Sequence, residues 1–169
     1  MRGRMKAVGL LVGVLGVMVM CWGGVANAAT DSKSVTVTAA IPALIRLTLN
    51  SGTVDLGSVD PETSPATATL GASVSSNRPW NLTVSKGSDL YNNVDNYYIP
   101  SSQLTFTVTT SDGRVTSTGS GEFGTTGTQV AAGNRGGNIS LDVNYSLVVT
   151  YDDPAGNYSA THTYTATTL

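Results

Sequence analysis

Side chains that could perform acid–base or nucleophilic chemistry are few in this sequence. Residues 29–169 contain one histidine, His162, and no cysteine. A Ser-His-Asp arrangement would have to use that imidazole as its base, and the sequence has no G-x-S-x-G motif of the kind that presents a nucleophilic serine. A zinc site needs three or four His, Cys or carboxylate ligands, which the scattered acids do not supply. We therefore predict a protein that is not an enzyme, with His162 packed at the rim of a core.

The segment 119–124 reads GSGEFG and matches the G-x-G-x-x-G motif of dinucleotide-binding proteins letter for letter. That motif binds a dinucleotide only where it follows a strand and opens a helix within a βαβ unit. No helical spacing of apolar residues follows it in this chain. The sequence therefore predicts a flexible loop rich in Gly and Thr here, and no organic cofactor.

The segment 87–102 is predicted to be the longest irregular stretch, and it gathers side chains that carry oxygen. Calcium takes hard oxygen ligands of this kind, and the candidate ligands are Asp89, Asn92, Asn93 and Asp95. The spacing of an EF-hand loop is absent, and Asn and Asp also favour turns without binding an ion. A calcium site and a simple turn are therefore both kept as interpretations.

The same segment carries three tyrosines, Tyr91, Tyr97 and Tyr98. An exposed aromatic ring with polar groups beside it is suited to binding a sugar, because it offers a flat apolar face next to hydrogen-bonding partners. The alternative is that these tyrosines cap the core. The segment is our first candidate for a glycan-binding surface.

A strand around Trp80 must position these loops. Trp80, Leu82 and Val84 alternate with polar residues, which is the period of a half-buried strand. Pro79 directly before it suits a strand start, where no ladder N–H is needed. This parity favours Trp80 as an anchor of the core, and a ligand contact through Trp80 and Leu82 is the alternative.

The rest of residues 34–169 shows the same two-residue alternation and no helical period. We predict an all-β protein with roughly 8–10 short strands, folded as one antiparallel β-sandwich of the Ig-like or Greek-key type. Predicted strands include 34–39, 104–109, a polar edge strand at 115–118, 128–132, 141–151 and 158–166. The sequence SDGR at 111–114 predicts a type I′ hairpin turn.

The N-terminus has the three parts of a secretory signal peptide. A basic start precedes an apolar run, and Ala26-Asn27-Ala28 fits an A-x-A cleavage site. We predict cleavage after Ala28, with residues 29–33 as a flexible lead-in; lipidation at Cys21 is an alternative, although Met20 before it is not the small residue expected there. The apolar run is too short for a good membrane span, and no covalent surface anchor is expected.

Removal of residues 1–28 leaves six Lys and Arg against eleven Asp and Glu, a net charge of −5. A chain of this charge is not expected to carry a basic patch for nucleic acid or for an anionic membrane, so neither partner is expected. The location predicted from these features is extracellular or associated with the cell wall.

Three short segments carry a resemblance to a known family. NRPWNLTV at 77–84 resembles the first W-x-L motif of WxL domains, the surface domains of Gram-positive bacteria, and DLG at 55–57 is similar to their early segment. PAGNYSA at 154–160 resembles the turn before their second motif, but that position reads YTA at 164–166. The resemblance implies non-covalent attachment to peptidoglycan. The final turn and Thr-rich strand also resemble spore-coat and pilus-type subunits.

Two functional hypotheses follow. In the first, the protein is a secreted, non-catalytic surface protein that attaches to the cell wall or to a glycan through the region of Trp80 and the tyrosine loop. In the second, it is a structural subunit of a fibre or coat, and the strand with Val35 and Val37 completes the sheet of a neighbouring copy by strand addition.

Overall fold

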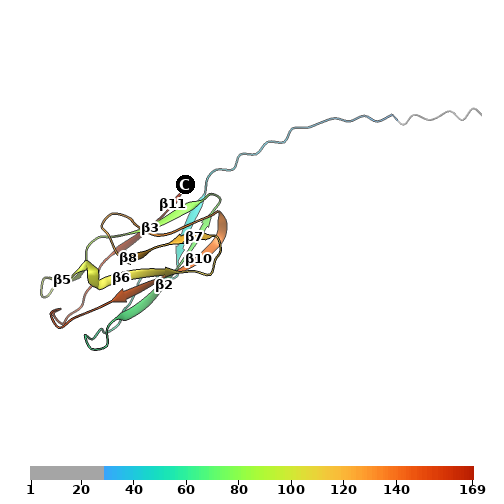
Figure 1. The fold of residues 1–169 in the computed structure, drawn as a ribbon. Helices are drawn as coiled ribbons and strands as arrows, with labels where there is room; N and C mark the ends of the chain where they lie inside the picture. The colour runs from blue at the N-terminus through green and yellow to red at the C-terminus, as the bar shows by residue number, and fades with distance from the viewer. Residues whose placement is uncertain (1–28) are drawn as a thin grey trace, which may run out of the picture. The chain divides into compact units, whose positions relative to one another are not determined.

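The structure is a computed structural model that describes residues 29–169, and the predicted signal peptide and Cys21 lie outside the described residues. The described chain forms eleven strands and one short 3₁₀ turn, and every strand pair is antiparallel (Figure 1). Nine of these strands form two sheets that pack face to face. The predicted antiparallel β-sandwich is confirmed, with one strand more than the predicted range.

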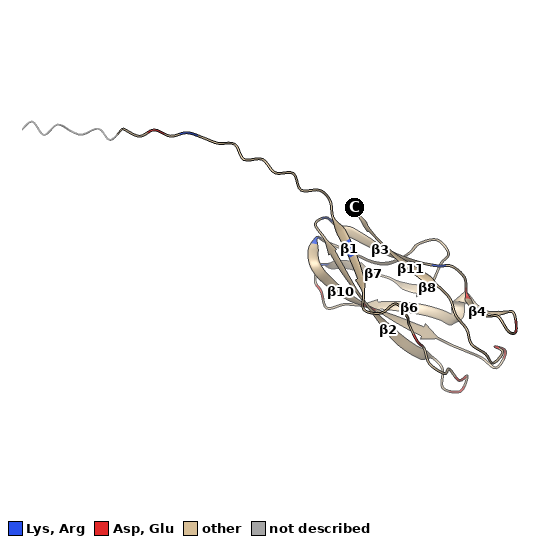
Figure 2. Ribbon diagram, turned by 180° about the vertical axis from the view of Figure 1, so that it is seen from behind, with Lys and Arg blue, Asp and Glu red and all other residues tan. Residues whose placement is uncertain are grey.

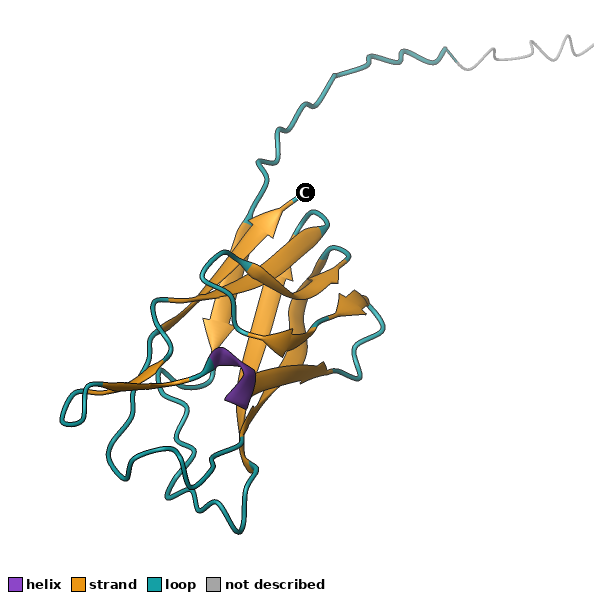
Figure 3. Cartoon of the chain, turned by 60° about the vertical axis from the view of Figure 1, so that its left-hand side comes forward, coloured by secondary structure: helices purple, strands orange, loops and turns teal. Residues whose placement is uncertain are grey.

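The first sheet has five strands in the order β1-β2-β10-β6-β8. Their bounds are β1 Ile45–Leu49, β2 Ala66–Ser76, β10 Gly136–Leu147, β6 Leu104–Thr109 and β8 Ser120–Glu122. The second sheet has four strands in the order β11-β3-β9-β7. Their bounds are β11 His162–Thr168, β3 Trp80–Lys86, β9 Thr128–Gly133 and β7 Val115–Thr118. A separate hairpin pairs β4 Leu90–Asn92 with β5 Tyr97–Ile99, and the 3₁₀ turn η1 Ser101–Gln103 follows it (Figure 3).

The core lies between the two sheets and follows the alternation of the sequence. On β10, Leu141, Val143, Tyr145 and Leu147 are buried while the residues between them face outward or are only partly covered. These four side chains point to the same face of their sheet, because they have the same parity in the strand. They pack in one core with the buried side chains of β3. The expected continuation of this face holds for Val149, which is partly buried and packs on the core although β10 stops at Leu147, but not for Tyr151, which is exposed.

One side of the sandwich is closed by a strand that changes sheets at Gly119. The amide of Gly119 donates to Val130 O of β9 at 2.7 Å, and its carbonyl accepts from Val108 N of β6 at 3.1 Å. A Cβ at this position would lie 2.0 Å from the carbonyl oxygen of Gln129. Only glycine fits so close a backbone crossing, so part of the GSGEFG segment is structural, with β8 at its centre, and the prediction of a loop throughout was wrong.

Three other predicted elements differ from the structure. The turn at 111–114 does not close a hairpin, because β6 and β7 belong to different sheets and Gly113 lacks the positive φ of a type I′ turn. The stretch 87–102 contains the β4–β5 hairpin instead of being irregular. The last strand begins at His162, four residues later than predicted. The short edge strand at 115–118 is confirmed as β7.

The predicted strand 34–39 is absent from the sheets of this chain: residues 29–44 belong to no strand, and all of their side chains are exposed. Residues 40–169 form one compact unit. Within residues 29–169, no helix has the length and apolar character needed to cross a membrane.

Candidate functional site

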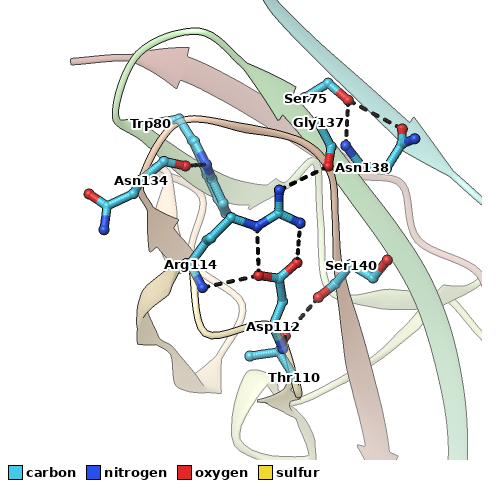
Figure 4. Close-up of polar contacts among 9 residues, drawn as sticks. All are labelled: Ser75, Trp80, Thr110, Asp112, Arg114, Asn134, Gly137, Asn138 and Ser140. Atoms are coloured by element: carbon cyan, nitrogen blue, oxygen red, sulfur yellow. Dashed lines mark hydrogen bonds and ion pairs between the residues drawn. The ribbon is translucent and has the colours of Figure 1, made fainter.

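Trp80 and Leu82 lie at the centre of the core. Both side chains are 0% exposed, and the indole N–H of Trp80 donates to the main-chain carbonyl of Asn134 at 3.0 Å (Figure 4). A buried indole whose only polar atom is bonded has the properties of a core anchor. The alternative in which Trp80 and Leu82 contact a ligand is incompatible with this burial, because neither side chain reaches the surface.

The turn between β6 and β7 holds Asn134, whose carbonyl accepts the hydrogen bond from the Trp80 indole. Asn134 N donates to Arg114 O at 2.8 Å, and the Arg114 guanidinium binds both carboxylate oxygens of Asp112 at 2.9 and 2.6 Å (Figure 4). The side-chain hydrogen bonds from Arg114 lower the pKa of Asp112 to about 2. This ion pair fixes the turn that carries the chain from one sheet to the other.

His162 belongs to an aromatic cluster with Phe123, Tyr145 and Tyr164. Its Nδ1 shares a 3.2 Å hydrogen bond with the Tyr145 hydroxyl, which shares a second one of 2.7 Å with Tyr164, and its ring lies 4.2 Å from the ring of Phe123. Burial, with a smaller contribution from the charge of Lys86, lowers the pKa of His162. Burial likewise raises the pKa of Tyr164. The imidazole is a neutral, packed group at the rim of the core.

The four candidate calcium ligands fall into separate hydrogen-bonding groups. Asp89 pairs with Lys86 and accepts from Ser101 Oγ at 2.8 Å, whereas the Asn92 amide donates to Asp95 at 2.7 Å. Burial opposes ionisation of Asp89, but the bonds from Lys86 and Ser101 outweigh it and hold the pKa of its carboxyl below the ordinary value. Within residues 29–169, no three His, Cys, Asp or Glu side chains converge on a common point.

Asn92 and Asn93 differ in their surroundings. Asn92 is buried, and its Oδ1 accepts from the amide of Val94 at 2.9 Å, so it shapes the tip of the hairpin. Asn93 lies exposed at that tip. These contacts correspond to the turn interpretation of the segment.

The three tyrosines of the β4–β5 hairpin divide between its two faces. Tyr91 and Tyr98 stack with ring centroids 4.5 Å apart, and Tyr98 is 50% exposed. Tyr97 points the other way, packs against the core and donates to Asp153 at 3.2 Å. Only the Tyr91–Tyr98 pair therefore presents a ring to solvent, beside the exposed polar tip of the hairpin.

One end of the sandwich, which we call the loop end, gathers three long loops at 50–65, 87–103 and 148–161 (Figure 3). Tyr151 joins the third loop to the first by donating to Glu62 at 2.7 Å, and an isolated β-bridge between Tyr91 and Ser159 joins the second loop to the third. These loops contain seven Asp and Glu and no Lys or Arg. Figure 2 shows acidic residues at their tips.

The opposite end, which we call the arginine end, carries an open groove of about 1060 Å³. Its lining includes Arg46, Arg78 and Arg135, together with residues 41–45 and 75–77. All three arginines are exposed, and none takes part in the ion pairs of residues 29–169, which join Lys33 to Asp31, Lys86 to Asp89 and Arg114 to Asp112. The two ends of the sandwich therefore carry opposite charge.

The chain before β1 is an exposed segment with the side-chain pattern of a strand. Val35, Val37 and Ile41 are 85%, 88% and 82% exposed, and with Ala39 they share one parity. Asn77 ends this free segment, because its amide holds Pro42 O at 2.7 Å and Leu44 N at 2.9 Å. Alternating apolar residues that cover nothing are unusual in a folded domain.

The side of the sandwich opposite Gly119 is open. Its edge strands, β1 and β11, lie beside each other. Their inward residues pack on the core yet stay partly exposed, whereas those of the neighbouring β3 are fully buried. We call this row the open seam; it consists of Ile45, Leu47 and Leu49 on β1 with Tyr164 and Ala166 on β11.

The chain was compared with protein-family models and with curated proteins, and neither comparison found a match.

Proposed function

We propose that this protein is an exported, non-catalytic structural subunit that assembles into a surface fibre or coat by strand addition. Residues 34–41 of one copy are the added strand, and the open seam of the next copy receives it. The observation that carries the proposal is the exposed row of Val35, Val37 and Ile41, which has the alternation of a half-buried strand and no sheet in its own chain to cover.

The dimensions of the two partners match. Eight residues in strand conformation span about 26 Å at ~3.3 Å per residue, and β11 is itself seven residues long. Edge strands present unpaired backbone groups that pair readily with another chain. Main-chain hydrogen bonds would give affinity, and the alternate apolar side chains would cover the partly exposed row of the seam.

The test is assembly of the full chain, expressed with residues 1–28 so that host export applies. We expect concentration-dependent oligomers or filaments by light scattering and negative-stain electron microscopy. Deletion of residues 29–41 removes the added strand, so the variant should stay monomeric with an unchanged circular dichroism spectrum of the sandwich. Monomeric wild-type protein at all concentrations, or filaments that survive the deletion, would overturn the proposal.

A matched pair of variants separates strand addition from a general effect of charge. Val35→Asp with Val37→Asp places carboxylates on the apolar parity and should abolish assembly, because burial of an unpaired charge is strongly unfavourable. Thr36→Asp with Thr38→Asp places the same charges on the outward parity and should leave most assembly intact. Equal effects of the two pairs would contradict insertion of this segment as a strand.

A second candidate function, attachment to a glycan or to peptidoglycan, is supported by the stacked pair of Tyr91 and Tyr98. The resemblance to WxL domains favours the same function, but the burial of Trp80 removes the side chain that most closely matches their motif. Co-sedimentation with purified sacculi tests this candidate. Tyr98→Ala should reduce binding, whereas Tyr151→Ala, at an exposed tyrosine of the same end outside the stack, should not.

A further inference from the structure

We infer that the subunits join head to tail with a fixed polarity: the arginine end of the copy that donates its N-terminal segment meets the loop end of the copy that receives it. This inference rests on the proposed strand addition and adds the direction of the inserted strand. The partner is a second copy of this chain, because the two ends of the sandwich carry complementary charges.

The arginine end supplies three cations that form no ion pair with Asp or Glu in the described chain, although Arg78 Nε donates to the main-chain oxygen of Leu169 at 3.1 Å. Arg46 lies on β1, Arg78 two residues before the start of β3 and Arg135 directly before β10, and all three line one groove. Arginine is suited to binding carboxylates across an interface, because its planar fork donates several hydrogen bonds and is less strongly hydrated than a lysine.

The loop end supplies the matching anions. Five of its acids are exposed and belong to no ion pair within residues 29–169: Asp55, Asp60, Glu62, Asp95 and Asp152. Two copies that meet loop end to loop end, or arginine end to arginine end, would place like charges opposite each other, which costs several kcal/mol across an interface. The charges therefore favour the head-to-tail arrangement, which leaves a free end on each chain of copies and can grow without limit.

This polarity fixes the direction of the inserted strand. The donor segment joins its own domain at Leu44, which lines the groove of the arginine end. When that end faces the loop end of the acceptor, Ile41 lies near the loop end and Val35 near the arginine end of the acceptor. In the acceptor, β11 runs from the loop end at His162 to the arginine end at Thr168. The donor segment is therefore antiparallel to β11 and parallel to β1.

Antiparallel addition to β11 also agrees with the positions of the apolar side chains. Val35, Val37, Ala39 and Ile41 can face inward opposite the inward residues of β11, over Ile45 and Leu47 of β1. Antiparallel pairing is slightly more stable per residue than parallel pairing, so β11 is the better template of the two edges.

Cysteine cross-linking measures the direction, because residues 29–169 contain no cysteine of their own. Copies with Thr36→Cys and Thr167→Cys should form disulfide-linked ladders under mild oxidation. Copies with Thr36→Cys and Thr163→Cys should not, because these two positions lie near opposite ends of the inserted strand, beyond the reach of a disulfide. Ladders from the second pair alone would overturn the inferred polarity.

Charge reversal tests the contact between the ends. Arg46→Glu with Arg135→Glu, and separately Glu62→Lys with Asp152→Lys, should each raise the concentration needed for assembly by about tenfold or more. A mixture of the two variants should assemble again through contacts of opposite charge. The control is Glu122→Lys with Asp142→Lys, which makes the same charge change at exposed positions on β8 and β10.

The outcomes of these experiments distinguish failure of the polarity from failure of strand addition itself. Loss of assembly in none of the charge-reversed variants, while deletion of residues 29–41 still abolishes it, would overturn the polarity and leave strand addition standing. Wild-type protein that never assembles would overturn both. Restored assembly in the mixture, together with ladders from the Thr36–Thr167 pair, would establish both.

Discussion

The indole nitrogen of Trp80 lies 3.0 Å from the main-chain carbonyl oxygen of Asn134, and this hydrogen bond joins the start of β3 to the turn before β10. The ring also packs on Gly133, where a Cβ would approach it to 2.5 Å. Trp80 therefore ties the two sheets together at the arginine end.

Replacement of Trp80 by alanine should cost about 3–5 kcal/mol in the free energy of unfolding, the usual range for loss of a large buried aromatic side chain. Urea unfolding followed by circular dichroism measures this loss. In the wild-type protein, Trp80 is the only tryptophan of residues 29–169. Its fluorescence should therefore resist quenching by acrylamide in the folded state and shift to longer wavelength on unfolding. Ready quenching in the folded state would contradict the burial.

Gly119→Ala should destabilise the sandwich by about 1–3 kcal/mol or more, because the new methyl group would overlap the carbonyl of Gln129 where the chain changes sheets. Gly52→Ala is the matched control, since a Cβ at Gly52 meets nothing within 4 Å. Thermal unfolding of the two variants compares them directly. Equal midpoints would show that the close crossing at Gly119 is not required.

The sequence predicted the sandwich and much of its core because the direction of a side chain in a strand is decided locally. The alternation of Trp80, Leu82 and Val84 identified a buried face without any knowledge of the partner strand. The same information cannot say which strands pair. The turn at Asp112 looked like a hairpin, but it carries the chain to the other sheet. Arg114 holds this turn by donating to Asp112 and to the carbonyl of Gly137 on β10.

The segment around Val35 is a second case in which the local sequence pattern predicts a strand but does not say which sheet the strand joins. Alternation is the same whether a strand completes its own sheet or that of another copy, so the sequence predicted a strand without its location. The open seam could not be predicted either, because it depends on β1 and β11, which are far apart in the chain and become neighbours only in the fold. The charged ends likewise arise from loops that the sandwich brings together.

Arg114→Lys should raise the pKa of Asp112 from about 2 towards its ordinary value, because a lysine cannot reproduce the paired hydrogen bonds of the guanidinium. A carbon-detected NMR titration of the Asp112 carboxylate measures the shift. Since the pKa of Asp112 is lowered by folding, its contribution to stability is present above the unfolded pKa and disappears as the pH falls towards 2. Arg114→Met, which removes the charge as well, should raise the pKa further.

The lowered pKa of His162 should make the stability of the fold depend on pH near neutrality as well. As for Asp112, stability should fall as the pH falls. Burial lowers the pKa of His162 below its ordinary value of 6.5, so the folded state keeps the imidazole neutral where the unfolded chain takes up a proton. Stability should therefore fall as the pH decreases from above 6.5 towards the folded pKa. Urea midpoints at about pH 7.5 and 5.5 bracket this window, in which ordinary carboxylates remain ionised.

His162→Gln removes the titrating group and should flatten this part of the profile, because no other histidine exists in residues 29–169. The variant loses the ring contact with Phe123 and so should be less stable at pH values above the window, where the wild-type imidazole is neutral. A falling midpoint of the same size in both proteins would show that another group titrates, and would contradict the assignment of His162 as a neutral core residue.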